Sequence, residues 1–370
     1  MLTVDGKTLA LDVVIDFETD FDFLSEAYRS HYRASTASAF QAPLWMHHIH
    51  RDLVPRLGAR QSTLVVRNRH DGGLVCVVPF IVQRSFGLSI LSPADFGVCD
   101  YNGPVADPVI LEALVNTPTT LDRIDALTAG FDLLLFRKCR NDGFAVERLF
   151  RRTSASPTEN AAYHSVIEDD FDLWRRRTIS RKFSKELGRL NRQLEAEHGP
   201  YQMRPARGET EIGAAFDFLR AVREGQFADD LLANPIYFDF YRAYAIAAEA
   251  EGEAITYVSY LAGKPVAVLF GVHGDGDFHA VQIGLDARNY GKFSLGNQII
   301  YQTIRHRFDE GFRRFDMGLG NTGYKSHFRV EETQLRNLTA AGSLLGATVG
   351  AIYVRYKPLK NWLKRLTPVR

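Results

Sequence analysis

Four side chains that could move protons or bind a reacting group fall within residues 278–329 of this 370-residue chain. They lie in two strand-like runs and in the polar loop that follows: His279, Asp316, Tyr324 and Lys325. An imidazole, a carboxylate, a phenol and an amine can together deprotonate an acceptor, protonate a leaving group and bind a carbonyl oxygen. We therefore predict these four as catalytic residues. The structural alternatives are a loop-capping Asp316, a core His279 with satisfied hydrogen bonds, and a Tyr324 that only packs.

Between the two strand-like runs, the sequence predicts a helix whose start could bind an anion. A loop signal at residues 286–291 precedes Ser294, a good N-cap residue, and apolar residues then recur at helical spacing until Gly311. The free amides at a helix start attract phosphate groups. We therefore predict a cofactor-binding segment made by Arg288, Gly291, Ser294, Leu295, Gly296 and Asn297.

Composition places the chain among ordinary globular proteins. Hydrophobic residues make up 45% and charged residues 24% of the sequence, and its length favours two domains. The net charge of +1 provides no overall field that would attract DNA or a membrane. The three cysteines are widely spaced, which is typical of a reducing cytoplasm. Residues 1–22 lack the basic start of a signal peptide, so we expect a cytoplasmic protein.

Two segments raise other possibilities. His47, His48 and His50 lack cysteine or carboxylate companions at ligand spacing, so we interpret them as part of a surface or half-buried helix and predict no metal site. Residues 338–354 carry no charge but fall short of the ~20 apolar residues of a membrane span. We interpret them as a strand end followed by a packed helix. The alternative is a basic helix at the membrane interface.

The order of elements predicts an α+β protein. In the first half, an Asp-Gly turn at residues 70–73 separates two apolar runs and predicts a hairpin. A linker signal at residues 154–157 suggests domains 1–160 and 161–370. The second half opens with a long helix that begins at Asp169 or Asp170 and ends near Glu197.

This long helix has a strongly basic side beside one apolar stripe. Its cations are Arg175, Arg176, Arg177, Arg181, Lys182, Lys185, Arg189 and Arg192. They could form a solvated face or bind a phosphate-bearing ligand. A membrane surface is the less favoured partner, because the apolar stripe is needed for a core.

Several motifs appear in an order that resembles one known family. The second half contains L-A-G-K-P-V-A at residues 261–267, F-D-M-G-L-G at 315–320 and G-Y-K-S-H-F at 323–328. The first half contains C-D-Y-N-G-P at 99–104, and the basic helix contains R-K-F-S-K-E-L at 181–187. This series resembles the FemAB-like, CelD/BcsL-type acyltransferases, whose second domain is of the acetyltransferase (GNAT) type.

The resemblance implies two tandem GNAT-like domains, with mixed, mostly antiparallel sheets flanked by helices. It further implies acyl transfer from an acyl-CoA co-substrate to an amine or hydroxyl of a small molecule, a glycan or an envelope-polysaccharide precursor. The protein would be cytoplasmic or peripheral to the inner membrane, near polysaccharide-synthesis machinery. Matching positions suggest five substrate-binding residues: Asp100, Tyr101, Arg181, Lys182 and Gln282.

Two alternatives keep the same fold. In one, the donor is aminoacyl-tRNA, as in the peptidoglycan-bridge branch of the superfamily, and the basic helix would contact RNA. In the other, the protein is a degenerate, non-catalytic partner in polysaccharide biosynthesis. Phe293, where the phosphate-binding loop expects a small residue, and Asn321, where an acid is expected, favour that second alternative.

Overall fold

The computed structural model describes residues 3–4, 7–8, 11–85, 87–140, 146–167, 170–226, 230–274, 276–320 and 323–354. The chain divides into unit 1, residues 1–161 and 333–370, and unit 2, residues 162–332. The C-terminal segment returns to unit 1, because its strand pairs with two strands of that unit. The sequence-based domains, 1–160 and 161–370, do not include this return.

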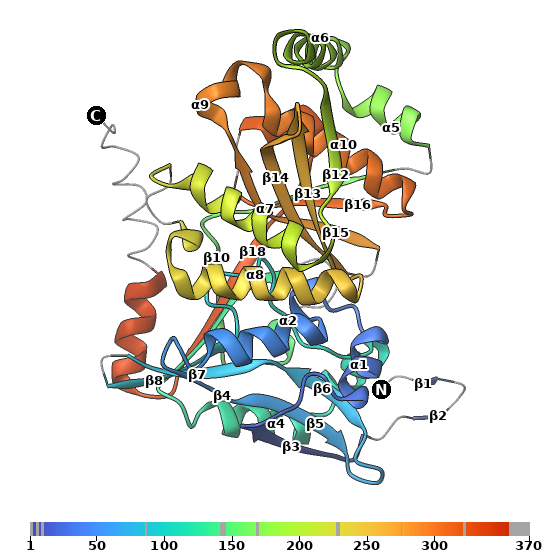
Figure 1. Cartoon of the computed structure of the whole chain (residues 1–370). Helices are drawn as coiled ribbons and strands as arrows, with labels where there is room; N and C mark the ends of the chain where they lie inside the picture. The colour runs from blue at the N-terminus through green and yellow to red at the C-terminus, as the bar shows by residue number, and fades with distance from the viewer. Residues whose placement is uncertain are drawn as a thin grey trace. The chain divides into compact units, whose positions relative to one another are not determined.

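Unit 1 contains two separate sheets (Figure 1). The six-stranded sheet has the order β10 (Ser154–Pro157), β18 (Leu335–Ala341), β9 (Leu133–Arg140), β8 (Leu88–Pro93), β7 (Phe80–Ser85) and β4 (Ala59–Gln61). The three-stranded sheet consists of β3 (Val13–Glu18), β5 (Thr63–Asn68) and β6 (Leu74–Val78). The pairing of β5 with β6 confirms the hairpin predicted around the Asp-Gly turn. A short ribbon, β1 (Thr3–Val4) with β2 (Lys7–Thr8), precedes both sheets.

One parallel connection in unit 1 recurs in unit 2. Strand β8 pairs in parallel with β9 at only two positions, Ile90 with Leu133 and Leu91 with Leu134. The connection between them contains α3 (Pro108–Val115) and α4 (Pro118–Thr128). The other helical segments of unit 1 are α1 (Glu26–Arg33), η1 (Ala39–Gln41), α2 (Pro43–His48), the π-helical turn η2 (Ile49–Leu53) and η3 (Val146–Arg148).

Unit 2 is built on one seven-stranded sheet. Its order is β12 (Tyr201–Pro205), β13 (Ala254–Leu261), β14 (Lys264–Gly274), β15 (Asp277–Leu285), β16 (Arg314–Leu319), β11 (Ala162–Val166) and β17 (Glu331–Thr333). The pair β15–β16 is parallel, and the pairs from β12 to β15 and between β16 and β11 are antiparallel. This mixed, mostly antiparallel sheet with flanking helices agrees with the predicted α+β class.

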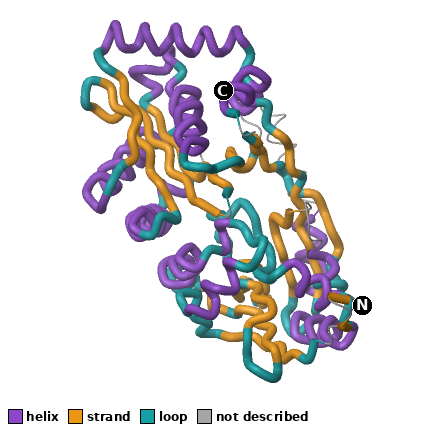
Figure 2. The backbone as a smooth tube through the Cα atoms, turned by 90° about the vertical axis from the view of Figure 1, so that its right-hand side faces the viewer, coloured by secondary structure: helices purple, strands orange, loops and turns teal. Residues whose placement is uncertain are grey.

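Helices flank this sheet, as Figure 2 shows. The helical segments are α5 (Phe171–Thr178), α6 (Arg181–His198), α7 (Gly208–Arg223), η4 (Leu231–Ala233), α8 (Pro235–Ala250), α9 (Ala287–Tyr290), η5 (Gly291–Phe293), α10 (Leu295–Asp309) and η6 (Gly323–Phe328). The main core of unit 2 joins α10, through Ile299, Ile300 and Ile304, to Phe278 and Phe315 of the sheet. Leu219 and Val222 of α7 approach the sheet at Gly284.

The long basic helix predicted from the sequence is broken into α5 and α6. Asp170 caps α5 as expected, but Ile179 adopts an extended conformation, with φ −97° and ψ 118°. The hydroxyl of Ser180 then accepts the amide of Phe183 and begins a new helix. The break escapes the sequence pattern because Ile179 is buried at a position that continues the apolar stripe.

The C-terminal segment is a strand end followed by a helix, as predicted, but the helix packs through its small residues, and Leu344, Leu345 and Ile352 are exposed. β18 is succeeded by helical residues 344–354. Gly342 donates its amide to the carbonyl of Asp132, and a Cβ on Gly346 would collide with that same carbonyl. The small residues therefore permit close backbone contact. No helix within the described ranges has the length and apolarity needed to cross a bilayer.

Candidate active site

The two central strands of unit 2 separate after a short parallel contact. Asp277–His279 of β15 pair with Arg314–Asp316 of β16, and His279 lies opposite Asp316 at the last paired position. Beyond this point β15 continues to Leu285 and β16 to Leu319 without pairing to each other. Because both strands run in the same direction, their diverging carboxyl ends lie at one edge of the sheet.

His279 and Asp316 form a buried pair where the strands diverge. Nδ1 of His279 lies 3.6 Å from Oδ2 of Asp316, and both side chains are almost completely inaccessible to solvent. The other carboxylate oxygen, Oδ1, accepts the amide of Gly318 at 2.7 Å. The contact between His279 and Asp316 is longer than a hydrogen bond, so Asp316 acts on the imidazole through its charge, while the amide of Gly318 fixes the carboxylate.

A bulge in β15 changes which of its side chains share a face of the sheet with His279. Phe270 of β14 pairs with Gln282 but the next residue, Gly271, pairs with Ala280, so Val281 is an extra residue in β15. The alternation of side chains then reverses. Gln282, predicted to bind substrate, consequently shares a face with His279.

Sequence reasoning missed two residues near this pair. His164 of β11 lies opposite Asp316 on its other side, and its Nε2 is 3.4 Å from Oε2 of Glu331. Arg223, at the end of α7, donates to the carbonyl of Ile283 at 2.6 Å in the diverging part of β15. The sequence marks both residues as polar, but only long-range strand pairing and helix packing bring them here.

The predicted cofactor-binding segment forms the start of α10. Ser294 occupies the N-cap position, yet its side chain makes no capping hydrogen bond, and its backbone is left-handed, with φ +54°. A non-glycine residue in this region costs about 1–2 kcal/mol. Within the described chain, the amides of Leu295, Gly296 and Asn297 donate to no protein acceptor. This helix therefore presents three unsatisfied N–H groups and a positive dipole end.

Phe293 does not obstruct this helix start. Its ring is completely buried in a cluster with Leu194, Tyr201, Leu261 and Val266. The side chain that replaces the expected small residue is therefore turned inward, where it anchors the loop. This burial removes one of the two observations that favoured a degenerate protein. The other residue, Asn321, lies outside the described residues.

Two cationic residues flank the loop, and α6 supports it. Arg288 of α9 is exposed, as is Lys292, whose amine is 2.7 Å from Oε2 of Glu197 at the end of α6. Gln298 of α10 donates to the carbonyl of Leu187 at 3.0 Å and ties the two helices together. The predicted substrate-binding residues Arg181 and Lys182 are exposed in the first turn of α6.

Tyr324 and Lys325 lie on η6, after the end of β16. Lys325 is buried, and its Nζ donates to the carbonyls of Gly318 and Leu319 at 2.8 and 3.2 Å. Tyr324 is half-buried and packs against the main core of unit 2. The amine of Lys325 therefore attaches η6 to the same strand end that carries Asp316.

The remaining predicted substrate residues, Asp100 and Tyr101, belong to unit 1. Tyr101 is buried, and the guanidinium of Arg140 lies 5.0 Å from its ring centre. Unit 2 by itself thus brings together His279, Asp316 and Gln282. In the described ranges, no group of three or more histidine, cysteine or acidic side chains is arranged to bind a metal ion.

Comparisons with known proteins agree with this architecture. Residues 181–326 match the family model of the acetyltransferase (GNAT) domain. FemX has a similar structure, with a TM-score of 0.60 and 9% identity over 85% of this chain and 94% of its own. No curated protein matches the sequence.

Two further solved structures share the fold over most of the chain. A conserved protein of unknown function from Bacteroides thetaiotaomicron gives a TM-score of 0.55, with 12% identity over 89% of this chain and all of its own. L-PGS from Bacillus licheniformis gives 0.51, with 11% identity over 92% and 98%. These likenesses extend over both units and confirm the predicted fold class. Residues 181–326 of unit 2, which match that family model, thus have the fold of an acetyltransferase-type (GNAT) domain.

Proposed function

We propose that unit 2 transfers an acyl group from an acyl-CoA to an amine or hydroxyl. The observation that carries this proposal is the uncapped start of α10. It lies at the edge of the sheet where β15 and β16 diverge beyond His279 and Asp316. A phosphate-binding helix start and an acid–base pair on adjoining elements are what a phosphate-bearing acyl donor requires.

The donor's phosphates would bind the amides of Leu295, Gly296 and Asn297. Arg288 adds positive charge on the preceding turn. The left-handed Ser294 supports this role, because backbone strain held at a helix start is typical of a binding site. The inward orientation of Phe293 keeps its ring away from the loop surface.

The transfer step follows from the pair on the diverging strands. The acceptor nitrogen or oxygen attacks the thioester carbon, a C–N or C–O bond forms, and the C–S bond breaks. Nε2 of His279 takes the acceptor proton, and the charge of Asp316, 3.6 Å from Nδ1, stabilises the imidazolium that forms. Tyr324 supplies the proton to the departing thiolate, and proton exchange with solvent restores both residues. Lys325 positions the loop of Tyr324.

We further propose that the protein is of the FemAB-like, CelD/BcsL type, with a glycan or polysaccharide precursor as acceptor. The order of its motifs and the likeness to FemX across both units support this assignment. A cytoplasmic location, at or near the inner membrane, would fit such an acceptor. Gln282, which shares the face of His279, is the proposed acceptor contact in unit 2.

Thermal unfolding in the presence of acetyl-CoA tests the donor. A ligand at a hundred times its dissociation constant stabilises a protein by about 2.7 kcal/mol. Acetyl-CoA should therefore raise the melting temperature by several degrees, whereas acetyl-pantetheine, which carries the thioester without phosphates, should not. Equal shifts with both compounds, or none with any acyl-CoA, would contradict phosphate binding at α10.

The exposed basic face of α5 and α6 favours a second candidate, an aminoacyl-tRNA donor. Seven of its eight cations are exposed: Arg176, Arg177, Arg181, Lys182, Lys185, Arg189 and Arg192. Binding of bulk charged tRNA should then weaken steeply between 50 and 200 mM salt, on the order of a thousandfold for six phosphate contacts. Changing Lys182 and Lys185 to Gln should reduce the salt dependence. An acyl-CoA-specific protein would show neither effect.

A further inference from the structure

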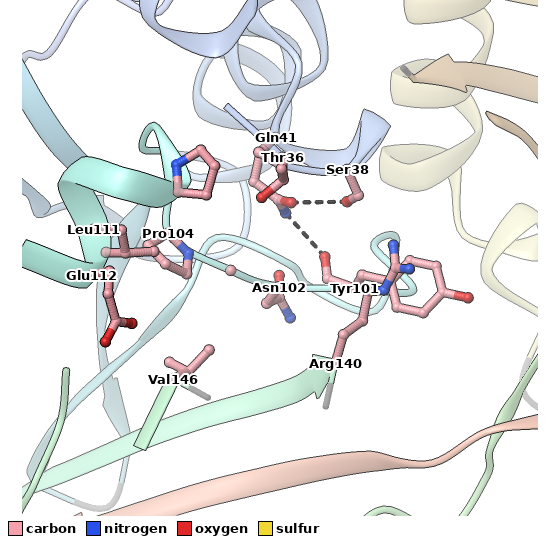
Figure 3. A pocket seen from close by; sticks show the side chains of 13 residues that line it. Thr36, Ser38, Gln41, Tyr101, Asn102, Pro104, Leu111, Glu112, Arg140 and Val146 are labelled. Carbon is pink, nitrogen blue, oxygen red and sulfur yellow. Dashed lines mark hydrogen bonds between the residues drawn. The ribbon is translucent and has the colours of Figure 1, made fainter. Parts of the chain in front are cut away.

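Unit 1 contains a pocket of about 450 Å³ that the proposed chemistry of unit 2 does not use. Figure 3 shows its walls: Thr36, Ser38 and Gln41 on one side, Leu111 and Glu112 of α3 on another, and Arg140 at the end of β9. Its volume lies within the 300–1,000 Å³ range of small-molecule sites. All these residues belong to unit 1.

This pocket lies at the topological counterpart of the donor site in unit 2. In both units, two parallel strands share a few pairs and are joined through helices, β8 to β9 here and β15 to β16 there. The loop after β8 forms a bridge between Asn102 and Cys139 of β9, and the next residues, Gly103 and Pro104, line the pocket. The pocket thus lies where the loop after β8 meets the end of β9.

The start of α3 differs from the start of α10 and is not suited to bind a phosphate. Oδ1 of Asp107 accepts the amides of Val109 and Ile110 at 2.8 and 3.1 Å. Pro108 has no amide hydrogen, and Leu111 donates to the carbonyl of Asp107. Every early amide of α3 is therefore occupied, and the capping carboxylate repels anions. Binding in this pocket depends on its side walls.

Those walls are rigid and suit a hydroxylated ligand. Gln41 is buried and fixed at both ends, by Ser38 at 2.8 Å and by the carbonyl of Tyr101 at 3.0 Å. Asn102 is held by Asp95 at 2.9 Å. The hydroxyl of Thr36 can donate and accept hydrogen bonds, whereas that of Ser38, whose proton goes to Gln41, can only accept from a ligand. Apolar surface beside them, from Pro104, Leu111 and Val146, can pack against the carbon face of a sugar ring.

The charges in the walls favour an anionic group on the ligand. Arg140 contributes a guanidinium that stacks over Tyr101. The carboxylate of Glu112 is bound through both oxygens to Arg148, at 2.5 and 2.7 Å. We propose that this pocket binds a small polyhydroxylated molecule with one carboxylate or phosphate group, such as a sugar acid or sugar phosphate. The inference deepens the proposed function and rests on it, because Tyr101, predicted to bind the substrate, lines this pocket and the ligand class fits a glycan-type acceptor.

Calorimetric titration of the full chain with four sugars tests the proposal. Glucuronate or glucose 6-phosphate should bind at least tenfold more tightly than glucose, and glucosamine more weakly still. Whichever anionic sugar binds identifies carboxylate or phosphate as the recognised group. Arg140→Gln should remove the tenfold preference for the anion. Failure of both anionic sugars to bind, or equal binding of glucose, would overturn the proposal.

The variant Gly103→Leu tests whether the sugar binds in this pocket. A side chain at Gly103 would enter open space without backbone strain, so the variant should fold normally and lose binding. Thr36→Leu provides a second pocket variant if the first is unstable. Thr119→Leu, on an exposed threonine of unit 1 outside this pocket, is the matched control and should bind as the native chain does. Binding that survives both pocket variants would place the site elsewhere. Acetyl-CoA should stabilise Gly103→Leu as it does the native chain. Loss of sugar binding in unit 1 can therefore be distinguished from loss of acyl-CoA binding in unit 2.

Discussion

Both units contain a pair of parallel strands joined through helices, but different side chains lie at the last pair of each. In unit 1, the last parallel pair is Leu91 with Leu134, and the following helix α3 is capped by Asp107. In unit 2, the last pair is His279 with Asp316, and α10 has no side-chain cap. The same arrangement of strands is thus an apolar joint in one unit and a candidate reaction centre in the other.

This difference teaches that the fold alone does not decide the chemistry. Diverging parallel strands create an open edge in either unit, but a proton can be moved only where an imidazole and a carboxylate meet. A helix start can bind a donor phosphate only where its amides remain unsatisfied. The comparison therefore yields experiments that alter one feature at a time.

The largest effect is expected from Asp316→Asn. Loss of the carboxylate whose charge stabilises protonated His279 should lower kcat about 10²–10⁴-fold, the usual contribution of acid–base catalysis. KM for the acyl-CoA should change little, because Asp316 does not belong to the phosphate-binding helix. Thiol release during transfer measures both constants. Asp277→Asn, on the same strand ladder, is the control and should retain normal kcat. A folded Asp316→Asn protein with native kcat would exclude this role.

The next effect concerns stability in acid, to which a histidine with a strongly lowered pKa contributes in each unit, His50 in unit 1 and His273 in unit 2. Burial lowers the pKa of His50 in unit 1 to about 3 and that of His273 in unit 2 to about 4. The charge of Arg307, whose Nη1 is 3.3 Å from Nε2 of His273, also lowers the pKa of His273, while a hydrogen bond to the carbonyl of Gly252 raises it. Because these folded-state values lie below the ordinary 6.5, protons bind the unfolded chain more tightly.

The unfolding free energy should therefore be highest above pH 6.5 and fall as the pH drops toward 4. His273 would account for up to roughly 3 kcal/mol of this loss. His273→Gln should reduce the loss in unit 2 and His50→Gln the loss in unit 1, which hydrogen exchange at pH 7 and pH 5 can resolve. A variant that keeps the native acid response would show that its histidine does not remain neutral in the fold.

Ser294→Asp should convert the start of α10 into the capped, acidic form found at α3. A carboxylate at this position would occupy the free amides and repel phosphate, so the dissociation constant for acetyl-CoA should rise about 10–100-fold, or roughly 1.4–2.8 kcal/mol. Ser294→Gly keeps the left-handed backbone and should bind like the native protein. Calorimetry measures both. Equal affinities for all three proteins would show that α10 does not hold the donor.

The sequence predicted the elements that carry the candidate site better than the contacts around them. Strand-like runs and a loop signal placed His279, Asp316 and the start of α10 on the right elements. The register that sets His279 and His164 on either side of Asp316 could not be predicted, because it depends on pairing between strands that are far apart in the sequence. Local patterns contain no information about such pairing.

Two other outcomes show the same limit. A phenylalanine at position 293 indicated an obstructed loop, yet residues from three distant segments, Leu194, Leu261 and Val266, bury its ring. The return of β18 to unit 1 also depends on distant pairing. The break at Ile179 is different, since Ser180 is a recognisable N-cap that the continuing apolar stripe concealed.

The smallest effect is expected from Asp107→Ala, which removes the cap of α3 and makes the two helix starts alike. The amides of Val109 and Ile110 would lose their acceptor, so the unfolding free energy should fall by about 1 kcal/mol. Asp107→Asn should restore most of this loss, since an amide oxygen can also accept the two bonds. Denaturant unfolding measures the difference. Even uncapped, α3 should not bind acetyl-CoA, because the adjoining strand pair carries leucines in place of His279 and Asp316. Acetyl-CoA binding gained at unit 1 would show that a free helix start is sufficient by itself.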